Sequence, residues 1–515
     1  TRKAIANFLV GPDDGDKPGS KSAFTDEEIL EFTKLQHLFI AKRYEELIGN
    51  VKSGGEKLLH GKLGAKIGKL MIDSFLAMRK KSEAIGVLDQ MTRLEPFSVK
   101  WILMKADLLQ SQAQKFNSIE LAKSVNDESY EVYRELGRWY SSSCDRERGE
   151  LRQQAFESGK EAYLKSLELN PSSDNRSWSE LHSLISKCEI SPTRKAADLD
   201  ELEKELAMQG THRWRLLNMK AKRFNADSKS DDIAKFKALL LESKRRVPVD
   251  EQVVFDSLLL SALMAARDKQ GAQSQYIEIC GSESHKLFSS VVIALSVYLR
   301  KFVAKDRDAA SLLGEFIGNE EFSAEVFSNL FYSLLALKEW QDAEKLIDQY
   351  KSEIHENYEM QLRSELAEWK GDFSTALELY DALISRDEDK YRTSRSYLLL
   401  CLGRYEEAKQ HAHEELRKVN FSVEDVALVV NYELARKKTG QKPDNTRLDA
   451  LLKFDGSDST KAVVAALRGH SKEAIEHIKS ELRFDATFRF DVSRWPVFDE
   501  LRSSSDLVAI LSKYD

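Results

Sequence analysis

The chain has 515 residues, too long for one ordinary hydrophobic core and long enough for several domains or one extended array. Only 23 glycines and 8 prolines occur, which favours helices, and the net charge of −7 argues against a protein that binds nucleic acid over its whole surface. The four cysteines lie far apart and form no CxxC pair. We therefore expect no zinc site, no disulfide framework and a reducing compartment, the cytoplasm.

Residues 1–24 hold a short helix-like piece followed by the polar stretch GPDDGDKPGSKS, which predicts a flexible linker. From Asp26 onward, apolar residues recur at i, i+3, i+4 and i+7, the spacing of an amphipathic helix. No segment alternates apolar and polar residues for long, so we predict an all-α fold with essentially no β-sheet. The longest apolar stretches, such as residues 291–299, fall short of the ~20 residues of a membrane span, and we expect no membrane insertion.

A short phrase with a central alanine repeats along the second half of the chain. The alanines are Ala272, Ala309, Ala343, Ala376, Ala408 and Ala474. The last four are spaced by 33, 32 and 66 residues, so the final gap covers two periods. A small residue at this point lets two helices approach closely. One such helical hairpin cannot bury its own apolar face, so the copies are expected to stack.

The first half carries a related but looser spacing of aromatic, small and apolar residues. Its members are Tyr133, Leu136, Gly137 and Tyr140, followed by Gly159, Tyr163, Ser166 and Pro171. These spacings resemble the tetratricopeptide repeat (TPR), whose 34-residue unit reads W-x2-L-G-x2-Y and then A-x3-F-x2-A-x4-P. The resemblance implies an α-solenoid of stacked antiparallel helix pairs, a TPR-like superhelix.

The match to the TPR consensus varies along the chain and indicates its organisation. After the linker of residues 1–24, we expect an N-terminal array over 25–171 and a C-terminal array over 201–490. Residues 172–200 fit the consensus poorly and are predicted to be an irregular connection, and residues 142–152 an insertion. Residues 491–515 break the rhythm, and we expect them to cap the last exposed hairpin.

Two arginines on one predicted helix are candidates for binding a partner. Arg134 and Arg138 are i, i+4 neighbours and would suit a carboxylate or phosphate, which implies an acidic peptide. In the TPR family this helix face lines the groove that holds peptides, and the same mapping adds Arg215, Tyr332 and Tyr397. The alternative is that both arginines are ordinary surface residues paired with acids such as Glu131 and Glu135.

Sequence signatures of chemistry are absent. There is no HExxH, GxSxG or CxxC motif, and His411 and His413 are two residues apart, on different faces of a helix. We therefore expect no catalytic residue, no metal and no cofactor. The most basic cluster, residues 212–224, contains Arg213, Lys222 and Trp214 without an acid, which could suit nucleic acid, although packing of Trp214 explains it more simply.

The leading hypothesis from these observations is a non-enzymatic scaffold or adaptor that binds a partner protein or peptide on its helical-repeat groove. Since the chain starts at Thr1 rather than Met, one alternative is the sensor or regulatory arm of a larger bacterial signalling or defence protein with an upstream effector domain. A second alternative, a nucleic-acid-binding helical repeat, depends only on residues 212–224.

Overall fold

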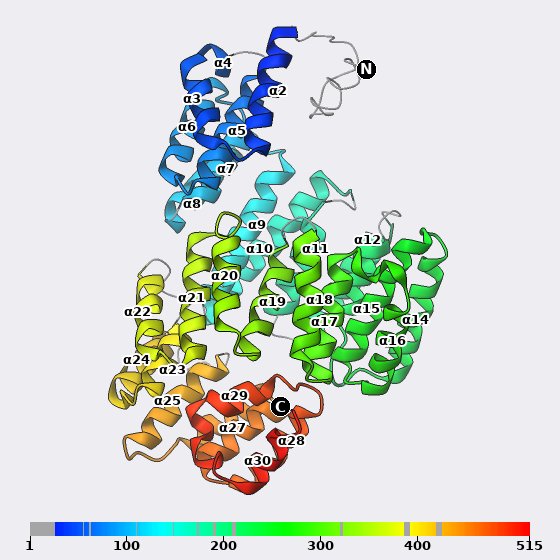
Figure 1. The fold of residues 1–515 in the computed structure, drawn as a ribbon, viewed down its shortest axis with the longest axis vertical. Helices are drawn as coiled ribbons and strands as arrows, with labels where there is room; N and C mark the ends of the chain where they lie inside the picture. Colours follow the sequence, from blue (N-terminus) through cyan, green and yellow to red (C-terminus); the bar gives the residue numbers. More distant parts are fainter. Residues whose placement is uncertain are drawn as a thin grey trace. The chain divides into compact units, whose positions relative to one another are not determined.

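The computed structural model describes residues 26–54, 56–60, 63–109, 111–147, 149–172, 175–188, 192–208, 213–319, 323–385, 392–418 and 425–514. These residues form helices and no strand, as predicted (Figure 1). They fall into two compact units, which we describe separately. Unit 1 comprises Thr1–Trp139 with Glu161–Asn170, and unit 2 comprises Tyr140–Lys160 with Pro171–Asp515.

Unit 1 is built from helices that follow one another in antiparallel pairs. They are α2 (Asp26–Ile40), α3 (Tyr44–Gly54), α4 (Glu56–His60), α5 (Gly64–Ala77), α6 (Lys81–Leu94), α7 (Val99–Leu108), α8 (Gln112–Val125) and parts of α9 (Tyr130–Arg146) and α10 (Gly149–Leu169). Its core contains fully buried side chains such as Leu88, Met91 and Trp101. The indole of Trp101 donates a hydrogen bond of 2.7 Å to Glu95, which satisfies its buried N–H.

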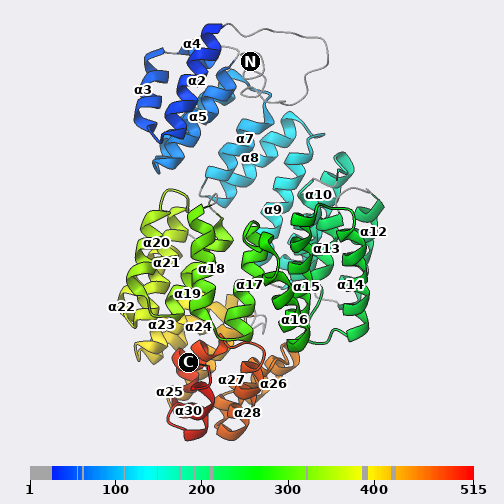
Figure 2. The same ribbon diagram turned by 45° about the vertical axis from the view of Figure 1, so that its right-hand side comes forward.

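Unit 2 continues the pairing (Figure 2). Its helices are α11 (Ser177–Cys188), α12 (Pro192–Met208), α13 (Arg213–Ala221), α14 (Ser230–Lys244), α15 (Gln252–Ala265), α16 (Lys269–Cys280), α17 (Ser289–Phe302), α18 (Asp306–Asn319), α19 (Ala324–Ala336), α20 (Trp340–Gln349), α21 (Glu356–Lys370), α22 (Phe373–Ile384), α23 (Arg392–Cys401), α24 (Tyr405–Lys418), α25 (Val426–Lys438), α26 (Asn445–Phe454), α27 (Asp458–Arg468), α28 (Ser471–Leu482), α29 (Phe488–Arg494) and α30 (Ser505–Leu511). The short 3-10 helices η1 (Val249–Glu251), η2 (Glu283–Lys286) and η3 (Pro496–Leu501) lie between them. The first helices of successive pairs also pack on one another, α15 on α17 and α17 on α19.

The repeated alanines all lie on the second helix of a pair. Each of them has a solvent exposure of 0%: Ala272, Ala309, Ala343, Ala376, Ala408 and Ala474. A larger side chain would hold the two backbones apart, because helix interfaces are packed as densely as organic crystals. The predicted fold class, a TPR-like solenoid of antiparallel helix pairs, is confirmed.

The turns inside the pairs also repeat. Gly371 follows α21 with φ of +82° and accepts the left-handed conformation that ends many helices. Lys338 occupies the same turn one repeat earlier with φ of 59°, at a higher steric cost because it carries a Cβ. The backbone N–H of the next residue, Asp372, bonds the carbonyl of Ala367 at 2.9 Å and closes the turn.

Several stretches that fit the TPR consensus poorly are nevertheless helical. Residues 142–152, expected to be an insertion, lie largely in the end of α9 and the start of α10. Residues 172–200, expected to be irregular, contain α11 and the first part of α12. The consensus positions specify close interhelical contacts, and a helix forms without them if its periodicity buries one face. The predicted linker of residues 1–24 lies outside the described residues.

The C-terminal residues pack against the last helix pairs of unit 2. Phe498 is fully buried, and Val497 and Leu507 belong to the same hydrophobic cluster. The indole N–H of Trp495 donates to the side-chain oxygen of Asn431 on α25 at 3.0 Å. Within the described ranges, every helix is too short or too polar to span a membrane.

Candidate functional site

Arg134 and Arg138 lie together on α9 in unit 1, as the sequence suggested, and they share one carboxylate. Nη1 of Arg138 lies 2.7 Å from Oε1 of Glu135, and Nη2 of Arg134 lies 3.5 Å from the same atom. Glu135 is 8% exposed, whereas the arginine side chains are 21% and 37% exposed. Burial raises the pKa of Glu135, while Arg138 and Arg134 lower it. The second acid considered from the sequence, Glu131, instead accepts a hydrogen bond from Ser129 at 2.8 Å.

Arg215 lies on α13, but its side chain is outside the described residues, so its contacts stay a prediction. The neighbouring basic residues of the 212–224 cluster are neutralised by acids of α12. Lys220 pairs with Glu203 at 2.5 Å, and Arg223 lies 2.6 Å from Asp200 and 3.2 Å from Glu203. These two cations therefore carry little uncompensated charge toward a phosphate.

Tyr332 and Tyr397 stand on α19 and α23, on either side of α21 in the order of first helices. We call the surface formed by the first helices α15, α17, α19, α21 and α23 the first-helix face. The hydroxyl of Tyr332 donates a 2.7 Å hydrogen bond to Glu365 of α21. Burial and this carboxylate raise the pKa of Tyr332, and burial with the nearby Glu368 raises the pKa of Tyr397. The structure thus places both predicted tyrosines beside Glu365 and Glu368, which we call the acidic pair of α21.

An arginine from the C-terminal end of the chain lies on this same surface. Arg494 of α29 forms an ion pair with Glu368, and its guanidinium stands 4.0 Å from the centre of the Trp369 ring. Phe490, one turn earlier on α29, packs on Trp369 with ring centres 5.2 Å apart. Carboxylate on one side and indole on another is an arrangement that selects a guanidinium.

The acidic pair of α21 has unusual electrostatics. Burial raises the pKa of Glu368 to about 7, and Arg494 opposes that rise while Glu365 and Asp491 add to it. Burial also raises the pKa of the nearby Cys401 thiol to about 12. These groups therefore sit in a poorly solvated surface, in which a matched cation is held more firmly than on an open one.

Reasoning from the sequence did not identify Glu368, Trp369 and Arg494 as candidate site residues. A tryptophan at the end of an amphipathic helix is an ordinary core signal, and an arginine 126 residues away gives no local pattern. The face of α21 that carries Glu365 and Glu368 was readable, since these residues are i, i+3 neighbours. Arg494, the partner of Glu368, could not be read from the sequence.

Other candidate chemistry gains no support from the described residues. None of their His, Cys, Asp and Glu side chains form a group of three or more placed to hold a metal ion. His413 stacks on the ring of Tyr432 at 5.7 Å between ring centres, and burial lowers the pKa of His182 to about 4. Neither histidine belongs to such a group.

Comparisons with known proteins add the following. No protein-family model and no curated protein matches the sequence. Among solved structures, the APC/C hetero-tetramer Cut9-Hcn1 is similar over 100% of this chain and 99% of that one, with 13% identity and a TM-score of 0.33. Yeast Tom70 is similar over 86% of this chain and 93% of its own, with 12% identity and a TM-score of 0.40. These similarities are too low to carry a statement on function, and the TPR-like character rests on the chain's own helix pairs and buried alanines.

Proposed function

We propose that this chain is a non-enzymatic scaffold that binds a partner protein or peptide on its helical-repeat surfaces. The observation that carries the proposal is the contact with Arg494. Glu368 and Trp369 of the first-helix face bind this side chain, which comes from a distant segment, through an ion pair and a cation–π contact. A surface that recognises one side chain through charge and an aromatic ring is suited to recognise segments of other proteins. The four cysteines are free, in keeping with a proposed cytoplasmic location.

The proposal assigns Arg134 and Arg138 of unit 1 to an acidic segment of the partner. Arg138 is more than a third exposed, and its planar guanidinium offers several N–H donors to a carboxylate. In unit 2, Tyr332 and Tyr397 are assigned to the first-helix face on α19 and α23, beside the two glutamates of α21. Arg215 is kept as a third candidate on α13.

The test is affinity capture from the cell extract with the chain as bait, followed by crosslinking and mass spectrometry to locate the partner. Bait with Arg134→Gln and Arg138→Gln is compared with a matched control, Arg43→Gln and Arg93→Gln, which removes two charges from exposed positions of unit 1. We expect the partner to be lost with the first bait and kept with the second. Loss with neither bait would remove the arginines from the binding surface, and capture of no protein would contradict the scaffold.

A second bait pair examines the tyrosines of unit 2. Tyr332→Phe and Tyr397→Phe remove two hydroxyl groups and leave the rings in place, so the helix packing is retained. If the partner reaches this surface, its crosslinks to α21 should weaken in the double variant. Unchanged crosslinks would exclude the hydroxyl groups from recognition.

A further inference from the structure

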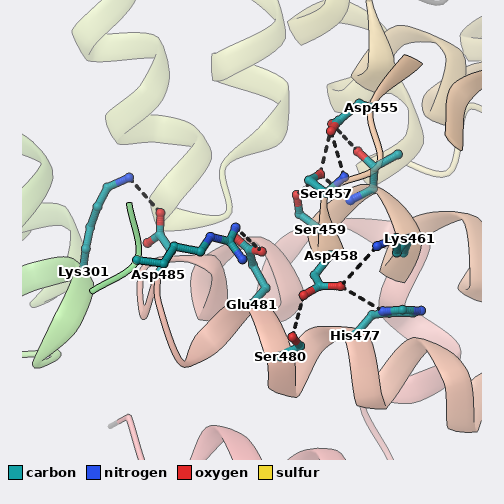
Figure 3. Close-up of polar contacts among 12 residues, drawn as sticks. Lys301, Asp455, Ser457, Asp458, Ser459, Lys461, His477, Ser480, Glu481 and Asp485 are labelled. Carbon is teal, nitrogen blue, oxygen red and sulfur yellow. Dashed lines mark hydrogen bonds and ion pairs between the residues drawn. The ribbon is translucent and has the colours of Figure 1, made fainter. Parts of the chain in front are cut away.

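The segment of residues 481–487, which comprises the last residues of α28 and the turn before α29, contacts positions that precede it by 184 to 214 residues. We call this segment the turn. Arg267, at the turn after α15, lies 3.1 Å and 3.3 Å from the two carboxylate oxygens of Glu481. Lys301 of α17 lies 2.7 Å from Asp485, an ion pair that Figure 3 draws as a dashed line. The N–H of Ala486 donates to the carbonyl of Lys301 at 2.6 Å. We call this set of contacts the seam.

The seam is held by polar contacts, while the apolar residues on its two sides belong to separate buried clusters. Leu260 and Leu295 belong to the cluster of α13–α17, and Leu482 and Phe488 belong to the cluster of α21–η3 and α30. The aromatic ring at the seam, Phe484, lies beneath the guanidinium of Arg267 at 5.1 Å. Displacing the turn from α15 and α17 would therefore leave both cores intact.

The two sides of the seam are complementary in charge. On the α15–α18 side stand Arg267, Arg300 and Lys301 with one acid, Asp306. The C-terminal side contributes Glu481 and Asp485, which meet Arg267 and Lys301, and Arg489, which forms a buried ion pair with Asp306. Each of these ion pairs across the seam therefore joins opposite charges.

The contacts of the turn differ in their access to water. The Lys301 side chain is 47% exposed and that of Asp485 25%, whereas Arg267 is 28% exposed and Glu481 only 12%. The more exposed pair contributes little and is screened by salt, and the Arg267–Glu481 pair contributes more. The buried pair of Arg489 and Asp306 anchors α29 to α18 just beyond the turn, since separating buried partners is costly.

A hollow of about 400 Å³ lies beside the turn, between it and the first-helix face. Its walls combine apolar side chains with the two cations that hold the turn. The apolar members include Met264, Ile293, Val297 and Phe302, and the cations are Arg267 and Lys301. A partner's aromatic side chain that took the place of Phe484 would find the guanidinium of Arg267, which Phe484 already contacts, and the apolar walls of the hollow beside it.

We propose that Arg267, Lys301 and this hollow form a docking site for a partner segment that carries two carboxylates and an aromatic ring. The turn of Glu481, Phe484 and Asp485 is its internal occupant. The inference rests on the proposed scaffold function and states its partner chemistry for unit 2. The internal turn competes at the high effective concentration of a tethered segment, so a partner binds after displacing it.

The probe is a fluorescein-labelled synthetic peptide with the sequence of residues 479–487, KSELRFDAT, titrated into the full chain by fluorescence anisotropy. A released variant, Glu481→Gln with Asp485→Asn, weakens the internal turn and should bind the peptide about tenfold more tightly than the unmodified chain. Adding Arg267→Gln and Lys301→Gln to the released variant should abolish that gain. The matched control, Asp342→Asn with Lys345→Gln on α20, neutralises an exposed ion pair and should change nothing.

Hydrogen exchange at the amide of Ala486 reports the seam without any ligand. The released variant should exchange faster at this amide than the unmodified chain. The charge swap Lys301→Asp with Asp485→Lys, made in the unmodified chain, keeps an ion pair of reversed polarity and should exchange at close to the unmodified rate. Equal peptide affinities for the released and unmodified chains would overturn the docking site, as would a gain that survives loss of both cations. Neither readout needs a cellular partner, so failure of the capture experiments and failure of this inference remain distinguishable.

Discussion

Replacing Gly137 by alanine should destabilise unit 1, although alanine is the better helix former. Gly137 is buried on α9, and a Cβ at this position would lie 2.6 Å from two ring carbons of Tyr163 on α10. Real Cβ atoms are essentially never so close to a neighbour. The ring is 2% exposed, and since protein interiors are densely packed, we expect the two helices to separate.

The magnitude follows from two opposing terms. Alanine gains about 1 kcal/mol over glycine in a helix interior. Overpacking a buried site typically costs about 1–3 kcal/mol, and the upper part of that range applies because the neighbour is a fully buried ring. We expect a net loss of about 1–2 kcal/mol. The same substitution at Gly86 on α6, where nothing lies within 4 Å, should instead stabilise by about 1 kcal/mol.

Amide hydrogen exchange read by mass spectrometry is the suitable assay, because repeat proteins open locally and a single unfolding midpoint is poorly defined. Amides of α9 and α10 should exchange about tenfold faster in Gly137→Ala, since 1.4 kcal/mol corresponds to a factor of about ten. The double variant Gly137→Ala with Tyr163→Leu should recover part of the loss. If Gly137→Ala and Gly86→Ala shift exchange in the same direction, the close-approach argument is refuted.

Three further perturbations probe unit 2. The folded-state pKa of Glu368, about 7, exceeds its ordinary 4.5, so its contribution to the free energy of unfolding is complete below the ordinary value and is lost as pH rises to about 7. Glu368→Gln should make the urea midpoint of unfolding less dependent on pH between about pH 5 and 8. An unchanged pH dependence of that midpoint would contradict the burial argument. Ala376→Leu, at a fully buried helix contact, should cost about 1–3 kcal/mol in urea unfolding followed by circular dichroism, and a neutral result would show that the interface is not close-packed. Phe498→Ala should cost about 3–5 kcal/mol and make residues after α28 sensitive to limited proteolysis, whereas resistance would exclude a role for Phe498 in holding this end.

Local patterns in the sequence determined the helices and their pairing. The alanine period placed six residues at positions that are fully buried, and the consensus spacing included Gly137, which the structure places against the ring of Tyr163. Both features depend on neighbours within one repeat. Sequence spacing reads such neighbours directly, because residues three and four apart share a helix face.

Tertiary structure alone decided which side chains meet across unit 2. Arg494 reaches Glu368 over 126 residues, and Arg267 reaches Glu481 over 214. In the sequence, the segment around each of these residues reads as an ordinary solvated helix surface. Stacking many helix pairs sums small rotations between repeats, and that sum brings the distant segments together. No local pattern encodes it, and the contacts between these distant segments are therefore a property of the stacked repeats as a whole.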